Sequence, residues 1–137
     1  MSTYEKALGL CLRYHEGQYR MDGVTPASVH PIMVSNQFTD ESLRILAVFH
    51  DIFEDTKITE GILYSNGFSE GMIFRIKLLS KDKNMDYLDY IRLVASDSST
   101  RLIKIADIEH NTSTMPDDPK YDDRRNKYKR ALEILNK

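Results

Sequence analysis

The stretch "AVFHDIFEDT" (residues 47–56) ends an apolar run with four ionisable side chains in six residues. The apolar residues 45–49 predict a helix face that packs in a core. A histidine, an aspartate, a glutamate and a second aspartate follow at positions 50, 51, 54 and 55. Burying such groups costs free energy unless they are paired or contact a cation. We therefore expect this helix to carry a polar site that the rest of the chain supports.

Helical signals continue on both sides of this stretch. Apolar residues recur at helical spacing, and no segment alternates with a period of two residues. The expected helix starts are the capping box Ser2–Glu5, Pro31 as a first helical residue, the caps Thr39 and Asp40, Thr59 and Ser69, and a start after Asn84. Neither an internal repeat nor a linker divides the sequence. These patterns predict an all-α fold, one compact bundle of seven or eight helices in a single domain over residues 1–137.

Composition excludes several functional classes. The formal net charge of −2 gives no electrostatic footprint for nucleic acid or acidic lipid. The longest apolar run is far short of the roughly 20 residues of a membrane-spanning helix. The first residues show no basic region followed by an apolar one, and the single cysteine, Cys11, is expected to be a buried structural thiol. We predict a cytoplasmic protein with no nucleic-acid or membrane partner, and homo-oligomer formation is left open.

Histidine 50 and its neighbour form a candidate metal-binding pair. If residues 43–53 form one helix, His50 and Asp51 lie about 100° apart and can lean toward one point beside it. An imidazole and a carboxylate that converge on the apolar side of a helix suit a divalent metal. Adjacent His-Asp pairs also occur by chance, so a polar cluster on a helix surface is the alternative.

Two further residues strengthen the metal hypothesis. His30 opens an earlier helix, and Asp107 interrupts the apolar run "LIKIA" of a later one. Considered alone, each residue has a structural interpretation. His30 is then a hydrogen-bonded histidine of the core or of a helix cap, and Asp107 is a hydrogen-bond partner at a helix end. Together with His50 and Asp51 they supply two nitrogen and two oxygen ligands for one ion, which leaves positions for water and substrate.

The order H…HD…D resembles the signature of the HD-domain metal-dependent phosphohydrolases. More closely, the chain is similar to the hydrolase domain of the Rel/Spo-type guanosine tetraphosphate enzymes and to the small alarmone hydrolases. The similar segments are "HEGQYRMDGVTPASVHPIMVS" (15–35), "AVFHDIFEDTKIT" (47–59) and "RLIKIADIEHNTST" (101–114). The most specific of them is "HDIFEDT", because general HD enzymes lack the Glu-Asp-Thr continuation.

This resemblance implies roles for individual residues. It makes His30, His50, Asp51 and Asp107 the metal ligands, with Mn²⁺ as the usual ion. It makes Glu54 and Asp55 the acidic pair that orients or deprotonates the attacking water. It assigns the base and the nucleotide pocket to Arg20, Asn111 and Thr114. His15 and His110 also match family positions, and we expect them to support the site.

The implied activity is hydrolysis of guanosine tetra- or pentaphosphate with release of the 3′ pyrophosphate, which is alarmone degradation in the stringent response. Three departures affect substrate recognition. Met21 replaces a lysine, Ala27 replaces an aromatic residue, and Ile108-Glu109 replaces Arg-Leu. These departures favour an alternative, an HD phosphohydrolase that acts on another nucleotide. A non-catalytic nucleotide sensor is the third possibility, but binding alone does not need Glu54 and Asp55.

Overall fold

The computed structural model describes residues 2–137, and helices make up almost all of its regular structure. The α-helices in this range are α1 (Thr3–Tyr14), α2 (Val29–Ser35), α3 (Glu41–Phe49), α4 (Ile52–Asp55), α5 (Glu60–Ser65), α6 (Glu70–Leu78), α7 (Tyr87–Ala95), α8 (Ser98–Thr114) and α9 (Asp122–Leu135), with the 3₁₀ turn η1 (Pro119–Tyr121) before the last. Eight α-helices in the described range span six residues or more, and α4 is a single turn. The prediction of an all-α bundle is confirmed.

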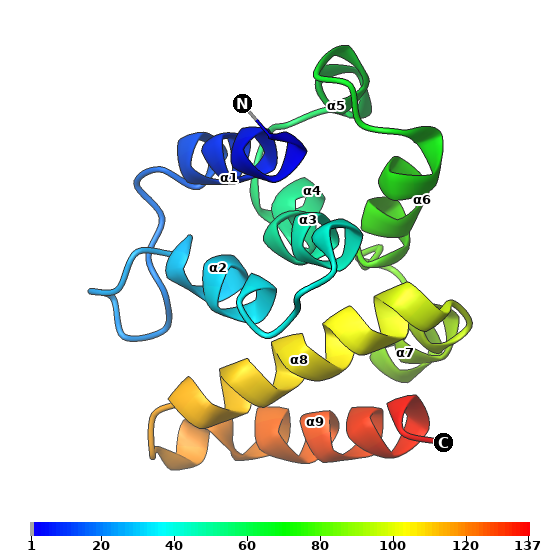
Figure 1. Ribbon diagram of the computed structural model, residues 1–137. Helices are drawn as coiled ribbons and strands as arrows, with labels where there is room; N and C mark the ends of the chain where they lie inside the picture. Colours follow the sequence, from blue (N-terminus) through cyan, green and yellow to red (C-terminus); the bar gives the residue numbers. More distant parts are fainter. Residues whose placement is uncertain (1) are drawn as a thin grey trace.

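Helices α3 and α8 form the centre of this bundle. In Figure 1, α8 runs between α9 on one side and the group of α2 and α3 on the other. Helix α3 also packs against α1, α2 and α6, and α7 packs against α8 and α9. The core contains the fully buried side chains of Phe49 from α3 and of Ile103 and Ile108 from α8. Polar residues at the facing surfaces of α3 and α8 are therefore held by a packed core.

Most of the expected helix starts match the structure. Ser2, Asp40, Thr59 and Ser69 each accept a backbone N–H through their side chains. The helix expected after Asn84 begins at Tyr87, and its cap is Asp86, whose carboxylate accepts the N–H groups of Leu88 and Asp89. The expected helix start at Pro31 is wrong, because α2 begins two residues earlier, at Val29.

The expected continuous helix over residues 43–53 is wrong, and its break lies within the His-Asp pair. Helix α3 ends at Phe49, and Asp51 leaves the helical conformation with φ −115° and ψ 7°. The carbonyl of Ala47 accepts the N–H of His50 at 3.3 Å and its ring Nδ1–H at 2.7 Å. This carbonyl would accept the N–H of Asp51 in a continuous helix, so the ring competes with the backbone ladder. The chain turns here, and α4 restarts in a new direction.

The expected burial of Cys11 is confirmed. Its side chain is fully buried in α1, and burial raises the pKa of its thiol to about 12.

Within residues 2–137, no helix combines the length and the apolar character needed to cross a membrane.

Candidate active site

A cavity of about 290 Å³ lies where the end of α3, helix α4 and helix α8 meet. Eight of the nine site residues predicted from the sequence line it, and Thr114 is the exception. The lining residues are Arg20, His30, His50, Asp51, Glu54, Asp55, Asp107 and Asn111, together with Leu79, Tyr87, Lys104 and Tyr128.

Three of the four predicted metal ligands form a compact buried group. His30, His50 and Asp107 each offer a ligand atom, and these atoms lie within 4.8 Å of one another. The Nε2 atom of His30 is 2.7 Å from Oδ1 of Asp107, and Nε2 of His50 is 3.3 Å from the same oxygen. The three side chains come from α2, from His50 directly after α3, and from α8. Residues 77 positions apart in sequence thus meet at one point.

The ring of His50 is oriented for a cation. Its Nδ1–H donates to the carbonyl of Ala47, so a neutral ring carries its lone pair on Nε2. This Nε2 atom is buried, has no hydrogen-bond partner in the described part of the chain, and faces the carboxylates of Asp107 and Asp51. A lone pair facing two carboxylates is repulsive unless a proton or a metal lies between them. Although burial lowers the pKa of His50, the charges of Asp51 and Asp107 raise it to about 9.

Asp51 lies at the edge of the three-residue group. Its Oδ2 atom is 3.8 Å from Nε2 of His50, and its Oδ1 atom is 3.4 Å from Nε2 of His15. Among the described residues, Oδ1 is buried and has no hydrogen-bond partner. Burial acts to raise the pKa of Asp51, but the charge of His50 and the contact with His15 lower it to about 2. Asp51 is therefore an ionised carboxylate with an oxygen available to a ligand.

These features fit a divalent transition metal. His50 Nε2 and Asp51 Oδ1 are buried atoms without a hydrogen-bond partner among residues 2–137, and both belong to predicted ligands. A donor set of imidazole nitrogens and carboxylate oxygens suits manganese, iron or zinc better than calcium.

Two further histidines contact the predicted ligands from outside. The Nδ1 atom of His110 is 2.7 Å from Nδ1 of His30, and the two rings stack with their centroids 4.9 Å apart. His15 contacts Asp51 and is itself held by Gln18, whose Oε1 atom is 2.9 Å from its Nδ1. Both positions agree with the expected supporting role.

Lys104 is a site residue that the sequence reasoning missed. Its Nζ donates to Oδ2 of Asp107 at 2.9 Å. Burial disfavours the positive charge of Lys104, but the negative charge of the Asp107 carboxylate stabilises it. The pKa of Lys104 is therefore held well above its usual value. The signal was present, because residues three apart share a helix face and Lys104 interrupts the same apolar run as Asp107. Tyr87 of α7 and Tyr128 of α9 also line the cavity.

The three predicted nucleotide-binding residues contact one another. Arg20 Nη2 donates to Oδ1 of Asn111 at 3.1 Å and to Oγ1 of Thr114 at 2.7 Å. The Nδ2 group of Asn111 in turn donates to Oδ1 of Asp107 at 3.0 Å. Thr114 thus holds Arg20 from outside the cavity. The loop of Arg20 is closed by an isolated antiparallel bridge between Tyr19 and Pro26.

Glu54 and Asp55 belong to α4 and line the cavity beside the metal group. Burial raises the pKa of both carboxyl groups. For Asp55 the nearby charges of Asp51 and Glu54 add to burial, and its pKa is about 6. Glu54 is held by the backbone N–H of Lys81, which donates to its Oε1. A carboxylate with a pKa near neutrality is suited to accept a proton in catalysis.

Comparisons with known proteins agree with this arrangement. No family model matches the chain. A guanosine-3′,5′-bis(diphosphate) 3′-pyrophosphohydrolase of Haemophilus influenzae is 29% identical over 134 residues, which cover 88% of this chain. The chain spans about a fifth of the length of that relative, since the alignment covers 20% of it.

A solved structure, described as a metazoan ortholog of SpoT that hydrolyses ppGpp and plays a role in starvation responses, superposes with a TM-score of 0.78. It is 22% identical, and the match covers 98% of this chain and 86% of that one. Its helical fold is therefore the fold of this chain. The resemblance to the Rel/Spo-type HD hydrolase domain, predicted from the sequence, is confirmed.

Proposed function

We propose that the protein is a metal-dependent hydrolase that removes pyrophosphate from the 3′ position of guanosine tetraphosphate or pentaphosphate. The observation that carries the proposal is the one cavity that eight predicted site residues line, among them His50, whose buried Nε2 has no hydrogen-bond partner within residues 2–137. The name of the Haemophilus influenzae relative supports the same reaction.

The roles of the residues follow from their positions. His30, His50, Asp51 and Asp107 hold the metal, for which we propose Mn²⁺. A divalent ion there stabilises negative charge on phosphate and makes water more acidic. Asp55 accepts the proton from the attacking water, and Glu54 orients that water beside it. Lys104 and Asn111 fix the two oxygens of Asp107 through hydrogen bonds.

A different nucleotide substrate is the alternative, and the surroundings of Met21 favour it. Met21 occupies the position of the family's lysine, so the loop of residues 19–26 carries Arg20 but no second cation. The loss of this charge favours the alternative. The Sδ atom of Met21 lies 3.5 Å from Nη1 of Arg124, so α9 brings one cation close to this position.

A nucleotide panel separates these functions. Purified protein with manganese is incubated with guanosine tetraphosphate, guanosine and adenosine monophosphates and cyclic nucleotides, and pyrophosphate and phosphate are measured separately. The proposal requires pyrophosphate from guanosine tetraphosphate. Phosphate alone from another nucleotide establishes the alternative, and binding without any product establishes a sensor.

Arg20→Ala tests base recognition. A guanidinium that stacks on a purine contributes roughly 1–3 kcal/mol at nucleic-acid sites, and the contact is equal in the ground and transition states. We therefore expect the KM for guanosine tetraphosphate to rise about tenfold, with turnover changed less than about twofold. Arg13→Ala, an exposed arginine of α1, is the control. A fall in turnover at unchanged KM would contradict the assignment of Arg20 to the base.

The remaining sequence predictions stay proposals. We propose that residues 1–137 act as one domain, that the protein works in the cytoplasm, and that it binds no nucleic acid. Size-exclusion chromatography with light scattering decides whether it forms a homo-oligomer.

A further inference from the structure

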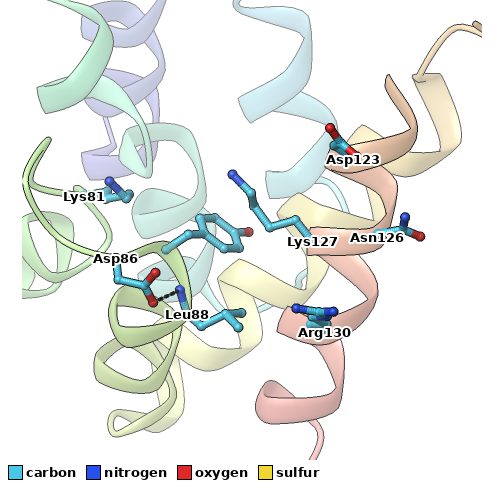
Figure 2. A pocket seen from close by; sticks show the side chains of 8 residues that line it. Lys81, Asp86, Leu88, Asp123, Asn126, Lys127 and Arg130 are labelled. Carbon is cyan, nitrogen blue, oxygen red and sulfur yellow. Dashed lines mark hydrogen bonds between the residues drawn. The ribbon is translucent and has the colours of Figure 1, made fainter. Parts of the chain in front are cut away.

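A second cavity, of about 540 Å³, lies next to the candidate active site between the start of α7 and helix α9 (Figure 2). Tyr87 lines both cavities, so the two share a wall. The hydroxyl of Tyr87 is buried and has no hydrogen-bond partner among the described residues. The volume of this cavity lies within the range typical of small-molecule sites. One extended ligand could therefore occupy both cavities and accept a hydrogen bond from Tyr87 between them.

The second cavity carries an excess of positive charge. Figure 2 shows Lys81, from the segment between α6 and α7, across the cavity from Lys127 and Arg130 of α9. Lys127 and Arg130 are three residues apart and share one helix face. Within residues 2–137, none of the three cations forms an ion pair with a carboxylate. The Nζ atom of Lys127 lies 5.0 Å from the centre of the Tyr87 ring, at the shared wall.

Two carboxylates also line the cavity, but both have structural roles. Asp86 accepts the backbone N–H groups of Leu88 and Asp89 at 3.1 and 3.2 Å and caps α7. Asp123 lies in the first turn of α9, where the helix dipole favours a negative charge. Three cations remain against two carboxylates, and the cations converge from two elements. This arrangement favours an anion that offers several oxygens, such as a diphosphate.

The loop that carries Arg20 offers less charge for phosphate than the resemblance implies. Met21 stands where a lysine is expected, and the second cavity shares no lining residue with this loop. Besides Arg20 and the Arg124 guanidinium beside Met21, a further source of positive charge next to the active site is the group of Lys81, Lys127 and Arg130.

We infer that the second cavity binds the diphosphate that the reaction leaves on the nucleotide, the 5′ diphosphate. Lys81, Lys127 and Arg130 supply its positive charge. The inference rests on the proposed function and locates the two phosphate groups of the substrate, one beside the metal ligands and one in this cavity. A nucleotide with a single phosphate group fills only one of the two positions.

The test uses guanosine 5′-diphosphate, which has no 3′ phosphate to lose. Its affinity for the manganese-loaded protein is measured by calorimetry and compared with that of guanosine. We expect the parent to bind the diphosphate at least tenfold more tightly than guanosine. The Lys127→Glu/Arg130→Glu variant should lose at least tenfold in affinity for the diphosphate, and the affinity should depend less steeply on salt. The control variant, Lys129→Glu/Lys137→Glu, makes the same change in net charge at exposed positions outside the cavity and should bind like the parent.

Each outcome decides between defined interpretations. Equal affinity for the diphosphate in the parent and the Lys127→Glu/Arg130→Glu variant, or no gain over guanosine in the parent, overturns the inference. Inorganic pyrophosphate that binds as tightly as the nucleotide, and weakens equally in this variant, assigns the cavity to the released product instead. If Lys127→Glu/Arg130→Glu loses its helical circular dichroism, Lys127→Gln and Arg130→Gln replace it, with about a threefold loss expected for each. If the nucleotide panel yields no pyrophosphate while the binding differences hold, the proposed function fails and the diphosphate site stands.

Discussion

Asp51→Asn should remove most of the bound manganese and lower turnover at least about 10³-fold, which corresponds to about 4 kcal/mol of transition-state stabilisation. The asparagine keeps the size of the side chain but replaces the ionised oxygen, which has no hydrogen-bond partner among the described residues, with a neutral amide. A neutral oxygen is a weaker ligand for a divalent ion. Elemental analysis after dialysis measures the metal, and pyrophosphate release from guanosine tetraphosphate measures turnover.

The matched control for this variant is Asp117→Asn, the same change at an exposed carboxylate before η1. It should keep the metal content and the activity of the parent. Circular dichroism should show that both variants keep their helices. If Asp51→Asn holds as much manganese as the parent, Asp51 is not a ligand and the site consists of the three-residue group alone.

The second large effect is expected at Asp55. Asp55→Asn should lower turnover at least about 10²-fold, the lower end for a general base, and should retain the metal. Glu54→Gln should retain the metal too, with a smaller loss of turnover, because Glu54 already accepts the N–H of Lys81. Single-turnover kinetics together with metal analysis measures both effects. Glu60→Gln, at an exposed position of α5, is the control, and full turnover in Asp55→Asn would show that the proton goes elsewhere.

The pH dependence gives an independent check on Asp55. Burial and the charges of Asp51 and Glu54 raise its pKa to about 6, so the carboxyl group is protonated below that pH and cannot accept a proton. The rate should therefore fall as the pH drops through the pKa of Asp55. A bound cation lowers this pKa, so the fall should lie at or below about pH 6. The acid limb should disappear in Asp55→Asn.

The sequence predicted the helices and most of the cavity because both depend on local patterns. Helical spacing and caps such as Thr59 are encoded within a few residues, and the motif "HDIFEDT" identified one side of the site. The break at His50-Asp51 was not predictable in this way. It depends on a hydrogen bond from the His50 ring to its own helix, which helix propensity does not describe.

Tertiary contacts account for the remaining omissions. Lys104 was recognisable as a polar residue in an apolar run, but its pairing with Asp107 depends on how deeply α8 is buried. The second cavity combines Lys81 with Lys127 and Arg130 of α9, which follow it by 46 and 49 positions in the sequence, and no local pattern links them. Lys127 of α9 lies against the ring of Tyr87, a contact between distant segments that the charge pattern of α9 does not reveal.

Asn111 joins two parts of the site, because its amide group donates to Asp107 and accepts a hydrogen bond from Arg20. An ion bound to an Asp107 oxygen would alter the hydrogen bond from Asn111 and, through Asn111, the hydrogen bond from Arg20. Metal loading and nucleotide binding would then be linked equilibria with a coupling free energy. Such coupling is reciprocal, so the factor by which manganese tightens the nucleotide is also the factor by which the nucleotide tightens manganese. Under the proposed function, the concentrations of the free metal and of the nucleotide would jointly set the occupancy of the site.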